Sequence, residues 1–254
     1  SIGNWRVESF PYMELDTVYA QMNNTTVTVN GKSVARKDAY NSVVLRNLVL
    51  PVWKCPSSSL PDAQPATWTT WWTNYSHQVP GYIGIMGAYP DPAGNTAAIY
   101  NSNYGGWWAN NGMLIPNAST RISDATDGLS NTIVVAEQSG KVKSCTTYTD
   151  GDTRNGYYTP WGGVTFNNPI GTQASSADCW GLGLTCVAYA INSPTCPAGA
   201  NTSYVGNSII NSFHTNGVNV LLGDGSVRFI SNSFDFTMFQ RMCAKSDGLT
   251  VTDQ

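Results

Sequence analysis

Few residues in this chain have side chains suited to catalysis, and their spacing matches no common catalytic motif. The chain has two histidines, His77 and His214, and no G-x-S-x-G, H-E-x-x-H, P-loop or G-x-G-x-x-G motif. His214 could act as a base oriented by Asp224, but ten residues of strand would separate them by roughly 25 Å or more. We therefore predict a protein that is not an enzyme, with a hydrolase of unrecognised type as an alternative.

Two acidic loops contain oxygen donors that a cation could use. The loop at Asp150 and Asp152 fails the EF-hand pattern, because Arg154 stands at a ligand position and no Glu follows at position twelve. A second group of such residues precedes a predicted strand, and we interpret it as a turn with a side-chain cap: Asp127, Gly128, Ser130 and Asn131. We expect no cofactor and no metal, with calcium at Asp150 and Asp152 as the alternative.

An aromatic-rich region offers flat rings among Asn and Gly residues. It contains two pairs of adjacent tryptophans and a nearby tyrosine: Trp71, Trp72, Tyr104, Trp107 and Trp108. Adjacent residues of a strand point to opposite faces, so one ring of each pair could face solvent. Core packing, a protein–protein interface and stacking against a glycan are the three interpretations.

The six cysteines predict disulfides in an oxidising compartment, and therefore an extracellular or cell-surface protein. They are Cys55, Cys145, Cys179, Cys186, Cys196 and Cys243. No pair has the CxxC spacing of a zinc cage. We expect two or three disulfides, formed within the cluster of Cys179, Cys186 and Cys196 with Cys145 as its fourth member. Buried free thiols are the alternative.

The overall composition excludes several classes of partner. Charged residues make up 11% of the 254 residues and the formal net charge is −3, whereas an ordinary soluble domain has roughly a quarter charged residues. Such a surface does not suit a phosphate backbone, so nucleic acid is not expected as a partner. No run of about 18 apolar residues occurs that could span a membrane.

Hydrophobic periodicity predicts short elements separated by long loops. We expect helices over 11–22 and 36–47, a hairpin turning at Asn30-Gly31, and strands over 48–53 and 132–135. The segments 57–111 and 139–205 are rich in Gly, Pro and Asn and lack periodicity. The chain contains no clear linker, so we predict a single domain over residues 1–254 with loop-rich insertions at these two places.

The C-terminal segment predicts a hairpin followed by a helix. A two-residue turn at Asp224-Gly225 would pair Leu222 with Val227 and Val220 with Phe229, and would place the apolar side chains on one face. Residues 235–245 should form a helix with Asp235 as its N-cap. Extending the register of the hairpin places His214 opposite Asp235.

Several segments of the chain resemble the motifs of one family in their expected order. His214, nine residues and then Asp224-Gly225 resemble the H-x9-DG signature of a prepilin-like family that is abundant in planctomycetes. The other matching segments are Trp5-Arg6-Val7, Pro11–Glu14, Pro51–Ser57, the looser Asn74-Tyr75 with Gly81–Gly84, and Arg121–Ile133 with Glu137 after it.

This resemblance implies an α+β, pilin-like head with an antiparallel sheet, a C-terminal hairpin and long disulfide-braced loops. In the family, a prepilin leader and a long apolar helix precede the head, and the helix would provide the only contact with a membrane. The implied role is a structural subunit of a filament, a type II secretion pseudopilus or a surface layer, with self-association as its main interaction. The alternative is a glycan-binding surface module that uses the aromatic loops.

Overall fold

The computed structural model of the chain describes most of the sequence. The described residues are 4–22, 26–29, 32–35, 44–65, 76–95, 99–101, 106–116, 118–145, 151–154, 161, 183–201, 206–249 and 251. Three of the predicted site residues with aromatic side chains, Trp71, Trp72 and Tyr104, lie outside these ranges, as do Asp150 and Cys179. The statements below concern the described residues.

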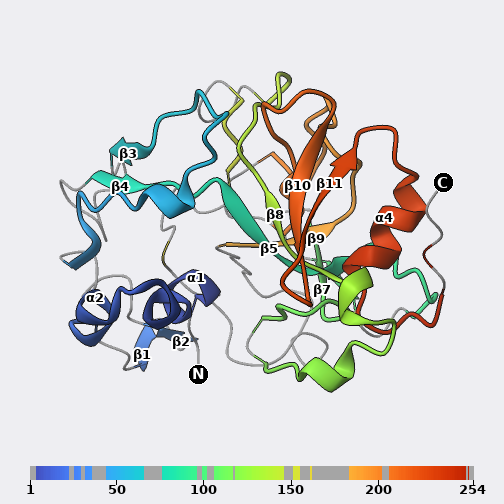
Figure 1. Cartoon of the computed structure of the whole chain (residues 1–254), viewed down its shortest axis with the longest axis horizontal. Coiled ribbons are helices and arrows are strands. Elements are labelled where there is room, and N and C mark those ends of the chain that lie inside the picture. Colours follow the sequence, from blue (N-terminus) through green and yellow to red (C-terminus); the bar gives the residue numbers. More distant parts are fainter. Residues whose placement is uncertain are drawn as a thin grey trace.

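A five-stranded sheet forms the centre of the α+β fold. Its strands are β5 (Tyr82–Ala88), β8 (Ile133–Glu137), β9 (Leu184–Val187), β10 (Gly217–Leu222) and β11 (Val227–Ser231), in the spatial order β11-β10-β8-β5-β9. Neighbouring strands are antiparallel except for β9, which runs parallel to β5. The predicted α+β fold class is confirmed, and the sheet is antiparallel as expected except at the β5–β9 pair, which makes it mixed. Figure 1 shows the sheet at the centre of the molecule, with the C-terminal helix beside it.

The main core lies between this sheet and helix α4 (Phe236–Cys243). Buried side chains from β5, β8 and β10 pack with Phe239 and Met242 of the helix. Asp235 caps the helix, since its carboxylate accepts a hydrogen bond of 2.9 Å from the backbone N–H of Met238. The predicted helix and its N-cap are thus confirmed.

The C-terminal hairpin is present, but its predicted register is wrong by one residue. Leu221 pairs with Val227 and Asn219 with Phe229. The backbone N–H of Gly225 donates to the carbonyl of Leu222, and Gly225 has a φ of 89°. The connection is therefore a turn with a glycine bulge, which takes three residues instead of two. As a result Val227 and Phe229 face solvent, with 69% and 49% of their surfaces exposed.

The N-terminal region forms short helical turns, which do not join into one helix. They are α1 (Trp5–Glu8), η1 (Phe10–Met13) and α2 (Asp16–Ala20). Glu14 has a left-handed backbone, with a φ of 60°, and this interrupts the helix predicted over 11–22. The strand predicted over 48–53 is also wrong, because Pro51 begins a 3-10 helix, η2 (Pro51–Trp53).

Three two-stranded ribbons and two 3-10 turns complete the described elements. The ribbons pair β1 (Thr26–Val29) with β2 (Lys32–Ala35), β3 (Ala63–Pro65) with β4 (Ser76–Gln78), and β6 (Ile99–Asn101) with β7 (Trp107–Ala109). The turns are η3 (Ile122–Asp124) and η4 (Leu129–Asn131). The first ribbon confirms the predicted hairpin, although Asn30 and Gly31 themselves lie outside the described residues, as does most of the helix predicted over 36–47.

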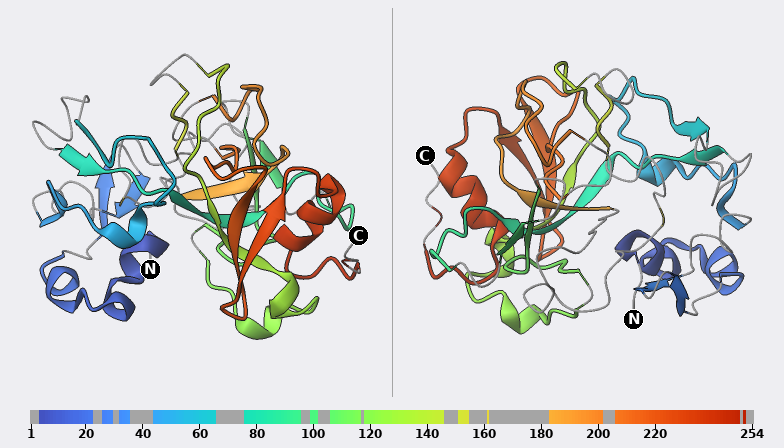
Figure 2. Two further views of the ribbon diagram at one scale, coloured as in Figure 1. Left: turned by 45° about the horizontal axis from the view of Figure 1, so that its top comes forward. Right: turned by 180° about the vertical axis from the view of Figure 1, so that it is seen from behind.

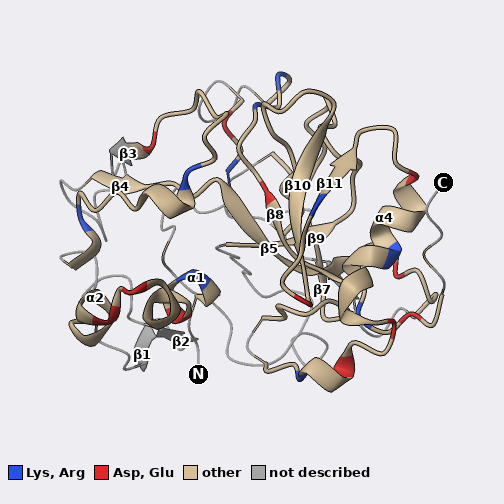
Figure 3. Cartoon of the chain, in the orientation of Figure 1, with Lys and Arg blue, Asp and Glu red and all other residues tan. Residues whose placement is uncertain are grey.

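Among the described residues, no helix has the length and apolar character needed to cross a bilayer. The two further views in Figure 2 show that the N-terminal helical turns lie on the opposite side of the molecule from α4. Lys, Arg, Asp and Glu residues are sparse along the ribbon, and the two signs are mixed (Figure 3).

Candidate functional site

Three polar side chains from distant parts of the sequence meet beside the central sheet. Cys55 follows η2, Glu137 is the last residue of β8, and His214 precedes β10. The His214 Nε2 atom lies 3.0 Å from Glu137 Oε1, and the Cys55 Sγ atom lies 3.3 Å from the same oxygen and 3.6 Å from His214 Nε2. We call these three residues the Cys–Glu–His cluster.

Backbone hydrogen bonds hold the Cys55 loop against the end of β8. The N–H of Gly81 donates to the carbonyl of Trp53 at 2.8 Å, and the N–H of Gln138 donates to the carbonyl of Gly81 at 2.8 Å. The Ser58 hydroxyl donates to the carbonyl of Ser139 at 2.7 Å. These hydrogen bonds fix the Cys55 loop relative to the end of β8, and so they place Cys55 next to Glu137.

His214 is positioned by the turn that leads into β10. Its backbone N–H donates to the Ser212 hydroxyl at 3.0 Å, and that hydroxyl donates to the carbonyl of Gly217 at 2.7 Å. The predicted neighbourhood of His214 and Asp235 is wrong, because residues 212–216 form a turn and the strand begins only at Gly217. The partner of the histidine is instead Glu137, on the strand next to β10.

Both polar ends of the histidine and the glutamate have partners. The Ser57 hydroxyl lies 3.2 Å from His214 Nδ1, and the backbone N–H of Asn219 donates to Glu137 Oε2 at 2.7 Å. The Glu137 side chain is 3% exposed and that of His214 is 30% exposed. The cluster is thus buried on the side of Cys55 and Glu137, and solvent reaches it from the side of His214.

Electrostatics keep the thiol and a nearby phenol protonated at neutral pH. Burial raises the pKa of Cys55, hydrogen bonds from Ser139 and Ser57 oppose this shift, and the Glu137 carboxylate adds to it. Burial, together with Cys55 and Glu137, raises the pKa of Tyr82 to about 12. A reactive cysteine needs an environment that lowers its pKa, so Cys55 is not set up as a nucleophile.

In the hydrogen-bond pattern around His214, the Cys55 thiol does not take the place of a triad nucleophile. In a triad, one histidine nitrogen faces the nucleophile and the other faces the orienting carboxylate. Here Nε2 of His214 faces both Cys55 and Glu137, so the thiol lies on the carboxylate side, while the Ser57 hydroxyl lies at Nδ1 on the opposite side of the ring. This arrangement can tie three segments together, and its sulfur, nitrogen and oxygen donors are of the kinds that bind transition metals.

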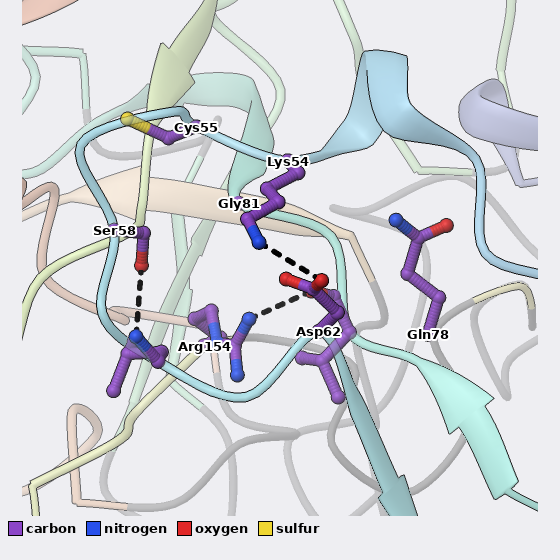
Figure 4. A pocket seen from close by; sticks show the side chains of 9 residues that line it. Lys54, Cys55, Ser58, Asp62, Gln78, Gly81 and Arg154 are labelled. Atoms are coloured by element: carbon purple, nitrogen blue, oxygen red, sulfur yellow. Dashed lines mark hydrogen bonds and ion pairs between the residues drawn. The ribbon is translucent and has the colours of Figure 1, made fainter.

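A second polar group lies in a small pocket next to Cys55. Arg154 and Asp152 form a buried ion pair, with 2.7 Å between Nη2 and Oδ2. Lys54 and Asp62 form a more exposed ion pair, with 2.9 Å between Nζ and Oδ2. In Figure 4 the side chains of Lys54 and Asp62 point toward each other, next to Arg154. Both carboxylate oxygens of Asp152 accept from Arg154. Its charge is therefore already balanced, which argues against Asp152 as a calcium ligand.

The predicted turn at Asp127 has a structural role. The Asp127 carboxylate accepts from the backbone N–H groups of Asp247 and Gly248, at 2.6 and 3.1 Å, and so ties the C-terminal segment to this turn. The residues after it form a cap, since the Asn131 side chain donates to the carbonyl of Asp127 and the Thr132 hydroxyl to that of Gly128. Ser130 lies in η4.

The hairpin turn and the aromatic residues are placed as follows. Asp224 accepts from the backbone N–H and the hydroxyl of Ser226, which stabilises the turn and lowers the pKa of the Asp224 carboxyl.

Trp108 is fully buried in the core, and Trp107 stacks on Tyr89 with 3.7 Å between ring centroids. Trp108 is therefore closed to a sugar, whereas the half-buried Trp107 has one ring face covered by Tyr89.

The cysteines form one disulfide among the described residues, between Cys145 and Cys196. This pair joins two of the four cysteines that were expected to pair within the loop cluster. Cys55, Cys186 and Cys243 are buried free thiols, so the prediction of two or three disulfides is wrong for these three. The disulfide is consistent with an extracellular protein.

Sequence reasoning did not bring Cys55, Glu137 and His214 together. They are separated by 82 and 77 residues, far beyond any spacing rule for ligands or catalytic groups. The signal available in the sequence was that each lies in one of the motif-like segments, Pro51–Ser57, the block ending at Glu137, and the segment from His214. The supporting residues Ser57 and Asn219 could be recognised only from the structure.

These features define an α+β protein whose mixed sheet carries a largely buried Cys–Glu–His cluster at the end of its middle strand, β8. Residues 1–237 match the model of a family described as "Protein of unknown function (DUF1559)". Since the match spans most of the chain, the chain belongs to this family, which agrees with the resemblance to a planctomycete-type family. No curated protein and no solved structure matches the chain.

Proposed function

We propose that the chain is the extracellular, non-enzymatic head of a pilin- or pseudopilin-like subunit that assembles in a filament, a pseudopilus or a surface layer. The order of its H-x9-DG and other motif-like segments supports this role. The observation that carries the non-enzymatic part is the state of Cys55: its thiol is buried and donates to Glu137, on the carboxylate side of His214, so it is not placed as a nucleophile. The motif residues therefore hold the head together.

An exposed apolar strand supports the assembly part of the proposal. β11 lies at the edge of the sheet, and Val227 and Phe229 both project from it into solvent. Monomeric proteins usually protect such edges with charges or by covering them. In a subunit of an assembly, this face would be covered by a second copy of the chain.

The test uses the full-length protein in the cells that produce it. Negative-stain electron microscopy of wild-type cells should show surface assemblies, which should be lost with Phe229→Asp and retained with Ile122→Asp. Ile122 is the matched control because it is also apolar and is 72% exposed, on a different part of the surface. Assemblies that persist unchanged in a strain lacking the protein would refute the proposal.

A further inference from the structure

The donor atoms of the Cys–Glu–His cluster form a compact triangle. Cys55 Sγ, Glu137 Oε1 and His214 Nε2 are separated by 3.0, 3.3 and 3.6 Å. Each of the three residues offers one potential ligand atom, and these three atoms lie within 4.8 Å of one another. Among the described residues, this is the group of His, Cys, Asp and Glu side chains that meets such a criterion.

The triangle has the size of one face of a zinc tetrahedron. Zinc bonds to sulfur are about 2.3 Å long, and bonds to nitrogen and oxygen are about 2.0–2.2 Å long. At tetrahedral angles these lengths place neighbouring donors roughly 3.3–3.7 Å apart. The two distances to sulfur already reach this range, and the nitrogen–oxygen pair would have to open by about 0.3 Å.

The groups behind the donors hold them in place, as the outer partners of a metal site do. Ser57 Oγ contacts the far nitrogen of His214, which turns Nε2 toward Cys55 and Glu137. The N–H of Asn219 binds Glu137 Oε2 and leaves Oε1 directed at the other two side chains. Each ligand also sits on a fixed segment: the loop bound to β8, the end of β8, and the turn before β10.

We propose that Cys55, Glu137 and His214 bind one Zn²⁺ ion, as thiolate, carboxylate and neutral imidazole, with a water molecule as the fourth ligand. In the described arrangement, the Cys55 thiol donates its proton to Glu137 Oε1. The cation takes the place of this thiol proton, which is released to solvent, and it binds the neutral imidazole that carries its proton on Nδ1, beside Ser57, and leaves Nε2 unprotonated. The partly exposed His214 gives the ion and the water a route to the site.

This set of donors favours zinc over calcium or magnesium, because those ions prefer oxygen ligands. A bound Zn²⁺ would link the loop after η2, β8 and the turn before β10, and so act as a structural staple. The expectation of no metal site rested on the missing CxxC spacing, which does not apply when the ligands come from three distant segments. The inference does not depend on assembly of the chain into filaments.

The first experiment measures metal binding to the untagged chain. The protein is stripped with a chelator and then titrated with Zn²⁺ against a chromophoric competitor. We expect one ion per chain with a submicromolar Kd, and a Co²⁺-substituted protein with a thiolate-to-metal charge-transfer band and intense tetrahedral d–d bands. Absence of tight binding, or a Co²⁺ spectrum without the thiolate band, would overturn the proposal.

The second experiment assigns the ligands. Cys55→Ser, Glu137→Gln and His214→Gln should each weaken Zn²⁺ binding by more than about 100-fold, since loss of an outer partner alone costs 10–100-fold. His77→Gln replaces the other histidine and should keep the wild-type Kd. Circular dichroism checks that each variant is folded, and the Co²⁺ spectrum of the wild-type chain decides the matter for any variant that is not. Unchanged binding in a folded Cys55→Ser variant would refute the assignment.

Discussion

The buried ion pair between Arg154 and Asp152 should contribute strongly to stability. The Asp152 carboxylate receives hydrogen bonds of 2.9 Å from Nε and 2.7 Å from Nη2 of Arg154. The same guanidinium donates to the carbonyls of Val79 and Pro61, at 2.8 Å each. The two side chains are only 4% and 3% exposed. Arg154 therefore joins three segments of the chain in a place that water does not reach.

Replacing Asp152 with Asn should lower the free energy of unfolding by about 3–5 kcal/mol, because it leaves a buried guanidinium without a counter-charge. The matched control is Asp62→Asn in the same pocket (Figure 4). Asp62 pairs with Lys54 at 2.9 Å, but these side chains are 35% and 43% exposed. Loss of that exposed pair should cost about 0–1 kcal/mol.

Urea unfolding followed by tryptophan fluorescence measures both variants. For a chain of this size, the loss in Asp152→Asn corresponds to a decrease in Tm of roughly 6–20 °C. A double variant, Asp152→Leu with Arg154→Met, should recover part of the loss because it buries no charge, although the carbonyls of Val79 and Pro61 lose their donor. Equal stability of Asp152→Asn and Asp62→Asn would show that the Arg154 pair is solvated, and would refute this reasoning.

Three further predictions concern other parts of the structure. Replacing both Cys145 and Cys196 with Ala should cost about 4 kcal/mol in a urea titration, because the disulfide closes a loop of 51 residues; a loss below 1 kcal/mol would contradict this. Gly225→Ala should cost about 1–2 kcal/mol by the same assay and Gly225→Asn less, because the φ of 89° is strained for a side chain while no atom lies within 4 Å of an added Cβ; equal losses would point to another cause. Burial raises the pKa of Cys243 well above its ordinary value of 9.0, so the unfolded chain releases this proton first and the free energy of unfolding should fall as the pH rises above 9. Urea midpoints at pH 8 and pH 10 should show this fall, it should be smaller in Cys243→Ala, and an identical fall in the variant would exclude the thiol as its source.

Several local features could be predicted from the sequence because they depend on neighbouring residues. The helix after Asp235 follows from its N-cap and apolar spacing, and the ribbon of β1 and β2 follows from a two-residue turn signal. The β8 strand follows from a short apolar run. The register of β10 and β11 could not be predicted, because a turn with an extra bulged residue and a two-residue turn are compatible with the same Asp224-Gly225 pair.

The composition determined the low content of charged residues, and the order of the short motifs determined the family and its α+β class. Both are properties of the sequence that do not depend on how the chain folds. Its tertiary structure alone decided which cysteines pair and which remain free, because pairing depends on distances between segments far apart in sequence. It also decided the partner of His214. The strand order β10-β8-β5 places Glu137 beside the start of β10 and carries the Cys55 loop to the same point. Such contacts depend on how the strands pack, so they cannot be predicted from the spacing of residues along the chain.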